Sequence, residues 1–136
     1  MSAVRLLPYA DFLGIQVKGT RSGAPLLTMP YADGLLGIDG KLHGGAIAGL
    51  LEIAGTAAID ATLEEERLDV RAIFKPINVT VDFMRPGLAA DCFACATVER
   101  VGTRIANVSV KAWQDDPERP IAAARINIAI GAGGEG

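Results

Sequence analysis

The chain has 136 residues, of which 50% are hydrophobic and 21% are charged, and its 13 basic and 16 acidic residues give a net charge of −3. This composition excludes a disordered polar chain, and the length is typical of one domain that buries its own core. We therefore expect a single domain over residues 1–136. The slight acidic excess gives no sign of a nucleic-acid surface, so nucleic acid is not an expected partner.

Further features of the sequence bear on cellular location. The longest apolar stretch, residues 44–59, contains Glu52 and is shorter than the roughly 20 residues of a membrane span. The N-terminal residues lack the apolar core and cleavage site of a signal peptide. Cys92 and Cys95 are too few for a disulfide framework, and in a strand they point to opposite faces, which disfavours a redox or zinc site. We expect a cytoplasmic protein without membrane contact.

Short elements are expected before the first long helix. Residues 8–14 are typical of a short helix, with proline at its start and glycine at its end. Residues 15–17 and 26–29 are candidate short strands on either side of a glycine-containing turn. Residues 32–40 contain three glycines and two aspartates, which predict a loop or short hairpin and not a helix.

Residues 44–63 predict a long helix that begins at His43 or Gly44. The helix is apolar around most of its circumference, so we expect it to be buried on most sides. The spacing predicts that its small residues and single acid share one face: Gly45, Ala48, Gly49, Glu52, Gly55 and Thr56.

Beyond the helix the pattern changes to the alternation typical of strands. Residues 77–83 alternate apolar and polar side chains, which predicts a half-buried strand with these residues inward: Ile77, Val79, Val81 and Phe83. Three further strands are expected at residues 92–100, 104–113 and 121–130, the first two joined by a tight turn. Short connections favour antiparallel pairing, so we expect a two-layer α+β domain whose sheet wraps the helix.

The helix start carries the clearest chemical signal. Gly44 and Gly45 leave backbone N–H groups unshielded at a helix N-terminus, which attracts a polarised carbonyl oxygen. A buried carboxylate tends to have a raised pKa, so Glu52, in an uncharged segment, is a candidate base or nucleophile. Thr56 follows one turn later, close enough to share a water with Glu52.

Distance argues that this site needs two chains. Gly44 and Glu52 are eight residues apart, which is about 12 Å along a helix. Reacting groups must approach to about 3–3.5 Å, so one straight helix cannot bring both residues to one carbonyl. Antiparallel helices of two chains can do so across a twofold axis. We therefore expect a homodimer with two shared sites, and a dimer of dimers stays open.

These residues resemble the hot-dog-fold acyl-CoA thioesterases of the PaaI-like family. The match includes His43-Gly44-Gly45, the acid nine residues after the histidine, and the threonine four residues after the acid. Residues 79–86, Val-Thr-Val-Asp-Phe-Met-Arg-Pro, and the hairpin around residues 102–104 are also similar. The resemblance extends from about residue 12 to residue 130 and implies a hot-dog fold, an antiparallel sheet wrapped around one central helix.

The resemblance implies hydrolysis of an acyl-CoA to a free acid and coenzyme A. The Gly44 N–H would polarise the thioester carbonyl, and Glu52 of the partner chain would act as general base or nucleophile. Thr56 would position the carboxylate or the water, and His43 would shape the loop and bind the thioester region. Coenzyme A enters as part of the substrate, so no separate cofactor or metal is expected. Residues assigned to coenzyme A binding are Gly45, Arg85, Thr103 and Arg104.

One position departs from the family pattern. Family members often carry Asn or Gln about six residues before the histidine, whereas this chain has Gly37, with Asp33 and Asp39 as the nearest polar residues. Two alternatives therefore stay open. One is a hydratase or dehydratase of the same fold, which would pair Asp39 with His43. The other is a non-catalytic acyl-CoA-binding module, which the missing loop amide would permit.

Overall fold

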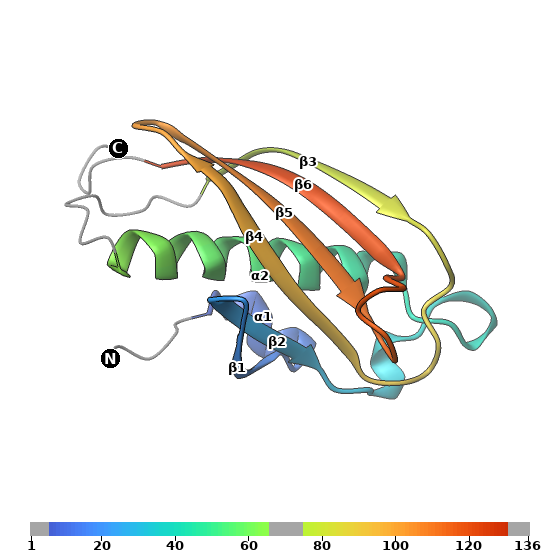
Figure 1. The fold of residues 1–136 in the computed structure, drawn as a ribbon. Coiled ribbons are helices and arrows are strands. Elements are labelled where there is room, and N and C mark those ends of the chain that lie inside the picture. Colours follow the sequence, from blue (N-terminus) through green and yellow to red (C-terminus); the bar gives the residue numbers. More distant parts are fainter. Residues whose placement is uncertain (1–5, 66–74, 131–136) are drawn as a thin grey trace.

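The computed structural model describes residues 6–65 and 75–130, so the expectation drawn from the first five residues lies outside it. Six strands form one antiparallel sheet in the order β1-β2-β4-β5-β6-β3, and this sheet curves around α2 (Figure 1). The predicted α+β architecture is confirmed. The elements are α1 (Pro8–Leu13), β1 (Gln16–Arg21), β2 (Ala24–Met29), η1 (Asp33–Leu35), η2 (Ile38–Gly40), α2 (Gly44–Glu65), β3 (Lys75–Phe83), β4 (Cys92–Val101), β5 (Ile105–Trp113) and β6 (Ala122–Ala129).

Helix α2 forms the centre of the core. Its length and apolar composition would suit a membrane span, but 72% of that stretch is buried inside the molecule, as in a core helix. Gly55 allows the sheet to approach, because a Cβ there would lie 3.0 Å from Ile126 Cδ1 and 3.3 Å from Val108 Cγ1. Strands β5 and β6 therefore pack directly on the helix backbone.

The six small or acidic positions of α2 do not form one free face. A Cβ at Gly49 would lie 2.8 Å from Leu13 Cδ1, so α1 covers that position, while Gly55 faces the sheet. Thr56 is buried as well. These six residues lie on one side of the unbroken helix, but α1 and the sheet cover the two margins of that side. An exposed or half-exposed stripe is left, which we call the α2 stripe: Gly45, Ala48 and Glu52.

The N-terminal half differs from the prediction in two places. Gly19 lies inside β1, at a bulge with φ +127°, and the hairpin turn is confined to Ser22 and Gly23, which both have positive φ. Strand β1 is therefore longer than predicted. Residues 32–40 form two short 3₁₀ turns, η1 and η2, and Leu36 pairs with Leu42 as in a hairpin.

Strand β3 is an edge strand with apolar side chains on the α2 side of the sheet. Its register places Val79, Val81 and Phe83 opposite inward-facing residues of β6. The alternation predicted this strand correctly, but the predicted burial of its inner side chains is wrong for a single chain. Val79 is 39% exposed and Phe83 is 56% exposed. The reason is that α2 packs mainly under β4 and β5 and leaves the β3 edge uncovered.

The two cysteines are free and lie on opposite faces of β4, as predicted. Cys92 faces the core, where burial raises the pKa of its thiol to about 12. Cys95 lies on the outer face and is half-buried, and burial also raises the pKa of its thiol. An unpaired thiolate at Cys92 would be costly, because the core supplies no water to solvate it.

We predict that Cys92 lowers the free energy of unfolding of the protein in alkaline solution. The unfolded thiol ionises near 9.0 and the folded thiol near 12, so between these values only the folded state holds the proton. The contribution of this group to the free energy of unfolding then falls by about 1.4 kcal/mol per pH unit. Urea unfolding of wild type and Cys92→Ala from pH 8 to 11 measures this. A stability difference that stays constant above pH 9 would contradict it.

Candidate active site

The side chain of His43 caps the start of α2. Its Nδ1 accepts a hydrogen bond of 2.8 Å from the Gly45 N–H. The His43 carbonyl accepts the N–H groups of Ala46 and Ile47 at 3.0 and 3.2 Å. This is the arrangement of an N-cap, in which the residue before a helix satisfies donors of the first turn. The Gly45 N–H is therefore already engaged.

The backbone N–H of Gly44 differs from the other N–H groups in the first turn of α2. Within the described part of the chain, no protein acceptor bonds to the Gly44 N–H, whereas the next three N–H groups all have partners. The missing side chain at Gly44 keeps this donor accessible, and the Phe83 ring lies 3.5 Å from the position that a Cβ would take. The helix start thus presents one free N–H at its positive end, beside an exposed aromatic ring.

The loop before the helix explains the departure at position 37. A Cβ at Gly37 would lie 3.2 Å from both Cα and Cδ2 of His43. The His43 N–H donates to the Leu35 carbonyl at 2.8 Å, and the Gly37 N–H donates to the Lys41 carbonyl at 2.7 Å. The loop therefore packs against the imidazole at a position where a side-chain amide would not fit without movement. The sequence marked Gly37 as unusual without giving this reason.

The connection after β3 also packs on the helix start. The Leu42 N–H donates to the Gly87 carbonyl at 2.9 Å, and a Cβ at Gly87 would lie 3.1 Å from Ile47 Cδ1. This contact brings Arg85 to the same end of the molecule, where its Nε donates to the Pro120 carbonyl at 3.2 Å. Sequence reasoning missed Gly87 and the contact of Phe83 with Gly44, because both depend on a connection distant in the chain.

Glu52 and Thr56 differ in accessibility. Glu52 lies in the α2 stripe and is partly exposed, which differs from the expectation of a buried carboxylate. Thr56 is buried, and its hydroxyl donates to the Ile53 carbonyl at 3.0 Å. That hydroxyl can still accept a hydrogen bond, but its proton is committed to the helix backbone. A role for Thr56 in holding water stays a prediction.

Thr103 and Arg104 lie far from Gly44 in one chain. Both are exposed in the turn between β4 and β5, at the end of the sheet opposite the start of α2 (Figure 1). Phe83, which lies beside Gly44, pairs with Ala122 of β6, and Ala122 pairs with Ala112 of β5. From Ala112 to Ile105, where β5 begins after the turn, the distance along the strand is about 23 Å. Their assignment to coenzyme A stays a prediction, as do those of Arg85 and Gly45.

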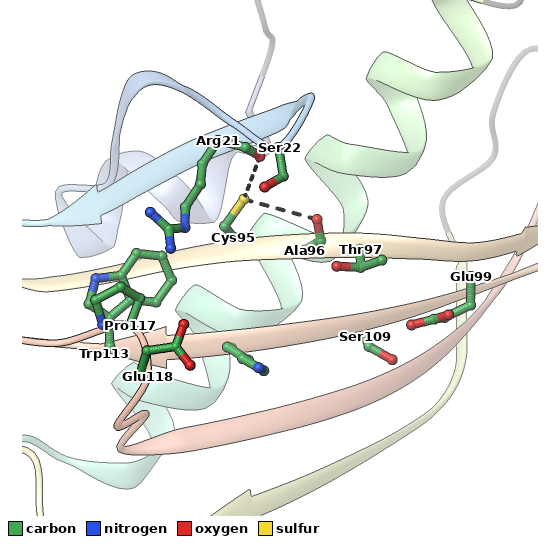
Figure 2. Close-up of a pocket in the computed structure, with 11 residues that line it drawn as sticks. Arg21, Ser22, Cys95, Ala96, Thr97, Glu99, Ser109, Trp113, Pro117 and Glu118 are labelled. Carbon is green, nitrogen blue, oxygen red and sulfur yellow. Dashed lines mark hydrogen bonds between the residues drawn. The ribbon is translucent and has the colours of Figure 1, made fainter.

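A separate hollow of about 390 Å³ lies on the outer face of the sheet, over β4 and β5. Figure 2 shows Arg21 and Ser22 at one side of it and Glu118 at the other. The Arg21 guanidinium lies 5.4 Å from the centroid of the Trp113 ring. Because α2 lies on the other face of the sheet, this hollow is distinct from the helix start. Among residues 6–65 and 75–130, no three His, Cys, Asp or Glu side chains gather as metal ligands.

A curved antiparallel sheet around one central helix defines a hot-dog fold, and a free N–H at the helix start is suited to polarising a carbonyl. The chain belongs to the thioesterase superfamily, whose profile matches residues 39–121, more than half of its length. The expected family is confirmed, and the superfamily's chemistry is thioester hydrolysis.

Individual relatives agree with this membership. A candidate esterase from Halobacterium salinarum is 32% identical over 128 residues, which cover 90% of this chain and 80% of the relative. A candidate thioesterase from Ralstonia eutropha, described as a phenylacetic acid degradation-related protein, is 25% identical with a TM-score of 0.77 over 90% of each chain. The PaaI protein of E. coli shares the fold, with 22% identity and a TM-score of 0.75 over 91% of this chain and 86% of PaaI.

We predict that the His43 cap contributes measurably to stability. His43→Ala removes the acceptor for the Gly45 N–H and should lower the free energy of unfolding by about 0.5–2 kcal/mol. His43→Asn supplies another good N-cap and should recover most of the loss. Urea unfolding at pH 7.5 compares the three proteins. Equal losses for the two variants would show that the hydrogen bond to Gly45 is not what His43 contributes.

Proposed function

We propose that this protein hydrolyses acyl-CoA thioesters to a free acid and coenzyme A. The observation that carries the proposal is the Gly44 N–H, which has no acceptor in the described structure and sits at the positive end of α2. A thioester carbonyl placed there would gain a hydrogen bond that strengthens as its oxygen becomes negative. Exposed Arg85 supports a phosphate-bearing substrate, because it lies at this end of the molecule with only Nε engaged among its described contacts.

The proposed reaction uses one carboxylate and one N–H. Glu52 of the partner chain accepts a proton from water, whose oxygen attacks the carbonyl carbon while the Gly44 N–H stabilises the oxyanion. The C–S bond then breaks, and the sulfur leaves as the thiol after taking up a proton. In the alternative course Glu52 attacks directly, and water hydrolyses the resulting anhydride. His43 holds the loop and the first turn in place, and Thr56, one turn after Glu52, helps to position the carboxylate or the water.

The carboxylate must come from a second chain. Glu52 lies eight residues beyond Gly44 in an unbroken helix, about 12 Å along its axis, so one chain holds the two groups apart. A twofold-related helix running antiparallel, with Ala48 near the axis, would place each Glu52 beside the other chain's Gly44. The half-exposed stripe of α2 leaves room for this approach.

The edges of the sheet indicate how the homodimer forms. At one edge, β1 carries exposed Lys18 and a bulge at Gly19, features that discourage strand pairing. At the other edge, β3 presents Val79 and Phe83 with much of their apolar surface exposed. Pairing of two β3 strands would continue the sheet, cover these side chains and bring the two α2 helices together.

The hydratase alternative needs an Asp–His pair. In the described structure Asp39 is exposed in η2 and is not among the hydrogen-bond partners of His43, whose Nδ1 binds the Gly45 N–H. These contacts favour hydrolysis over hydration. A non-catalytic binding module would share the free N–H but would not depend on Glu52, so activity measurements separate these functions.

We predict that removing one N–H abolishes most of the activity. Gly44→Pro deletes the free N–H at the first helical position, where proline is tolerated, and should lower kcat by about 10²–10³. Gly44→Ala is the matched control, because it keeps the N–H and its Cβ makes only ordinary contact with Phe83. Thiol release from acetyl-, octanoyl- and phenylacetyl-CoA measures turnover. Full activity of Gly44→Pro would exclude the proposed role of this N–H.

The shared site can be tested by mixing two inactive variants. Glu52→Gln should lose turnover by about 10²-fold or more, whereas Glu64→Gln, exposed on the same helix, should not. Coexpressed Gly44→Pro and Glu52→Gln chains would pair at random, so about half of the dimers would be mixed and about a quarter of all sites complete. Recovery of about a quarter of wild-type activity supports sites shared between chains. No recovery in verified mixed dimers would contradict them.

We predict that a charge on the inner face of β3 separates the chains. Val79→Lys would bury an ammonium group between the paired strands, so sedimentation should show a monomer without turnover. Thr80→Gln is the control, because Thr80 lies on the same strand but faces outward beside Arg125, and glutamine adds a long polar side chain without a charge. This variant should stay dimeric and active. A dimeric Val79→Lys protein would place the interface elsewhere.

A further inference from the structure

Two exposed aromatic rings lie on the short helix α1. Phe12 is 82% exposed and Tyr9 is 50% exposed. Their ring centroids are 5.9 Å apart and their planes differ by 15°, so the rings stack on each other and present apolar surface to solvent. Exposure of this much aromatic surface forgoes the free energy that burial would contribute, so a partner for these rings would gain that energy.

The rings border the α2 stripe. A Cβ at Gly49 would lie 3.0 Å from Tyr9 Cε2, so the Tyr9 ring rests directly on the helix at Gly49. Glu52 follows three residues later, which is about 4.5 Å along the helix axis. The aromatic pair therefore begins within one helical turn of the carboxylate, on the same chain.

The opposite margin of the stripe is also apolar. The Phe83 ring lies against Gly44, at the side of the helix where β3 runs. Tyr9 and Phe12 therefore border the stripe within one turn of Glu52, whereas the Phe83 ring borders it at Gly44, about 12 Å along the helix. A thioester whose carbonyl reacts beside Glu52 would find this apolar surface within reach of its acyl group, whereas the coenzyme A phosphates lie at the far end of the pantetheine arm.

We propose that Tyr9 and Phe12 are specificity-determining residues that form the wall of the acyl site. The inference rests on the proposed thioester hydrolysis and adds its substrate class. The favoured acyl groups are apolar and long enough to reach about one helical turn beyond the reacting carbonyl. Acetyl groups are too short to touch the rings, and acyl groups ending in a carboxylate would lose hydration against them.

The test compares wild type with Phe12→Ala on a series of straight-chain thioesters from acetyl-CoA to decanoyl-CoA. Wild-type kcat/KM should rise with chain length. Phe12→Ala should lower kcat/KM for octanoyl-CoA by about tenfold, the effect of losing part of one phenyl contact, and should change the value for acetyl-CoA less than twofold. Phe12→Leu keeps apolar surface and should restore most of the octanoyl activity.

Ile105→Ala is the matched control. Ile105 is 45% exposed, but its neighbour Ala106 faces the core, so Ile105 points from the outer face of the sheet, away from α2. Its loss should leave the chain-length profile unchanged. Equal losses for acetyl- and octanoyl-CoA in Phe12→Ala would overturn the proposal, as would a changed oligomeric state with an unchanged profile.

A binding measurement keeps this inference separate from the proposed function. S-octyl-coenzyme A is a thioether that cannot be hydrolysed, and S-ethyl-coenzyme A is its short counterpart. Calorimetry should show that Phe12→Ala weakens the octyl compound about tenfold and the ethyl compound little. If wild type hydrolyses no thioester, the proposed function fails, and these affinities still decide whether the rings bind the acyl group. Equal affinities in wild type and variant would overturn the inference.

Discussion

The curved sheet buries most of α2, and this burial limits where a ligand or a second chain can reach the helix. Helix α2 packs directly on β5 and β6 through Gly55 and on α1 through Gly49, so in its first half only Gly44 and the α2 stripe are left for a ligand or a second chain. Glu52 lies on that stripe. The same packing fixes the axis of the helix, and so the direction of its dipole and of the free Gly44 N–H. The candidate site therefore follows from the packing of the core.

The start of α2 is held by contacts that converge from three segments. The His43 side chain satisfies the Gly45 N–H, the Leu35 carbonyl accepts the His43 N–H, and the Gly87 carbonyl accepts the N–H of Leu42. These contacts hold the helix start in place, although the Gly44 N–H has no acceptor among the described residues. A donor held in a fixed position needs no reorganisation when charge develops on a substrate oxygen, which is the physical basis of an oxyanion site.

In the proposed homodimer, the second copy would complete both the sheet and the candidate site of the first. Strand β3 exposes apolar side chains toward the α2 side of the sheet, and α2 exposes the stripe that carries Glu52. Covering both with a second copy would bury Val79 and join the separated groups of the site. The burial of apolar surface and the proposed reaction would then both favour pairing through β3. The bulge and the charge on β1 discourage strand pairing at the other edge of the sheet.

Local periodicity and spacing were enough to predict the long apolar helix, the strands at the C-terminal end, and the positions of His43, Gly44 and Glu52 at and along that helix. Three other features become visible only in the folded chain. Gly49 and Gly55 face different neighbours, Phe83 is exposed beside Gly44, and a side chain at position 37 would crowd the imidazole of His43. Such contacts join segments distant in the chain. The sequence pattern shows which side chains are apolar, but which of them are buried depends on contacts that form only when the chain folds.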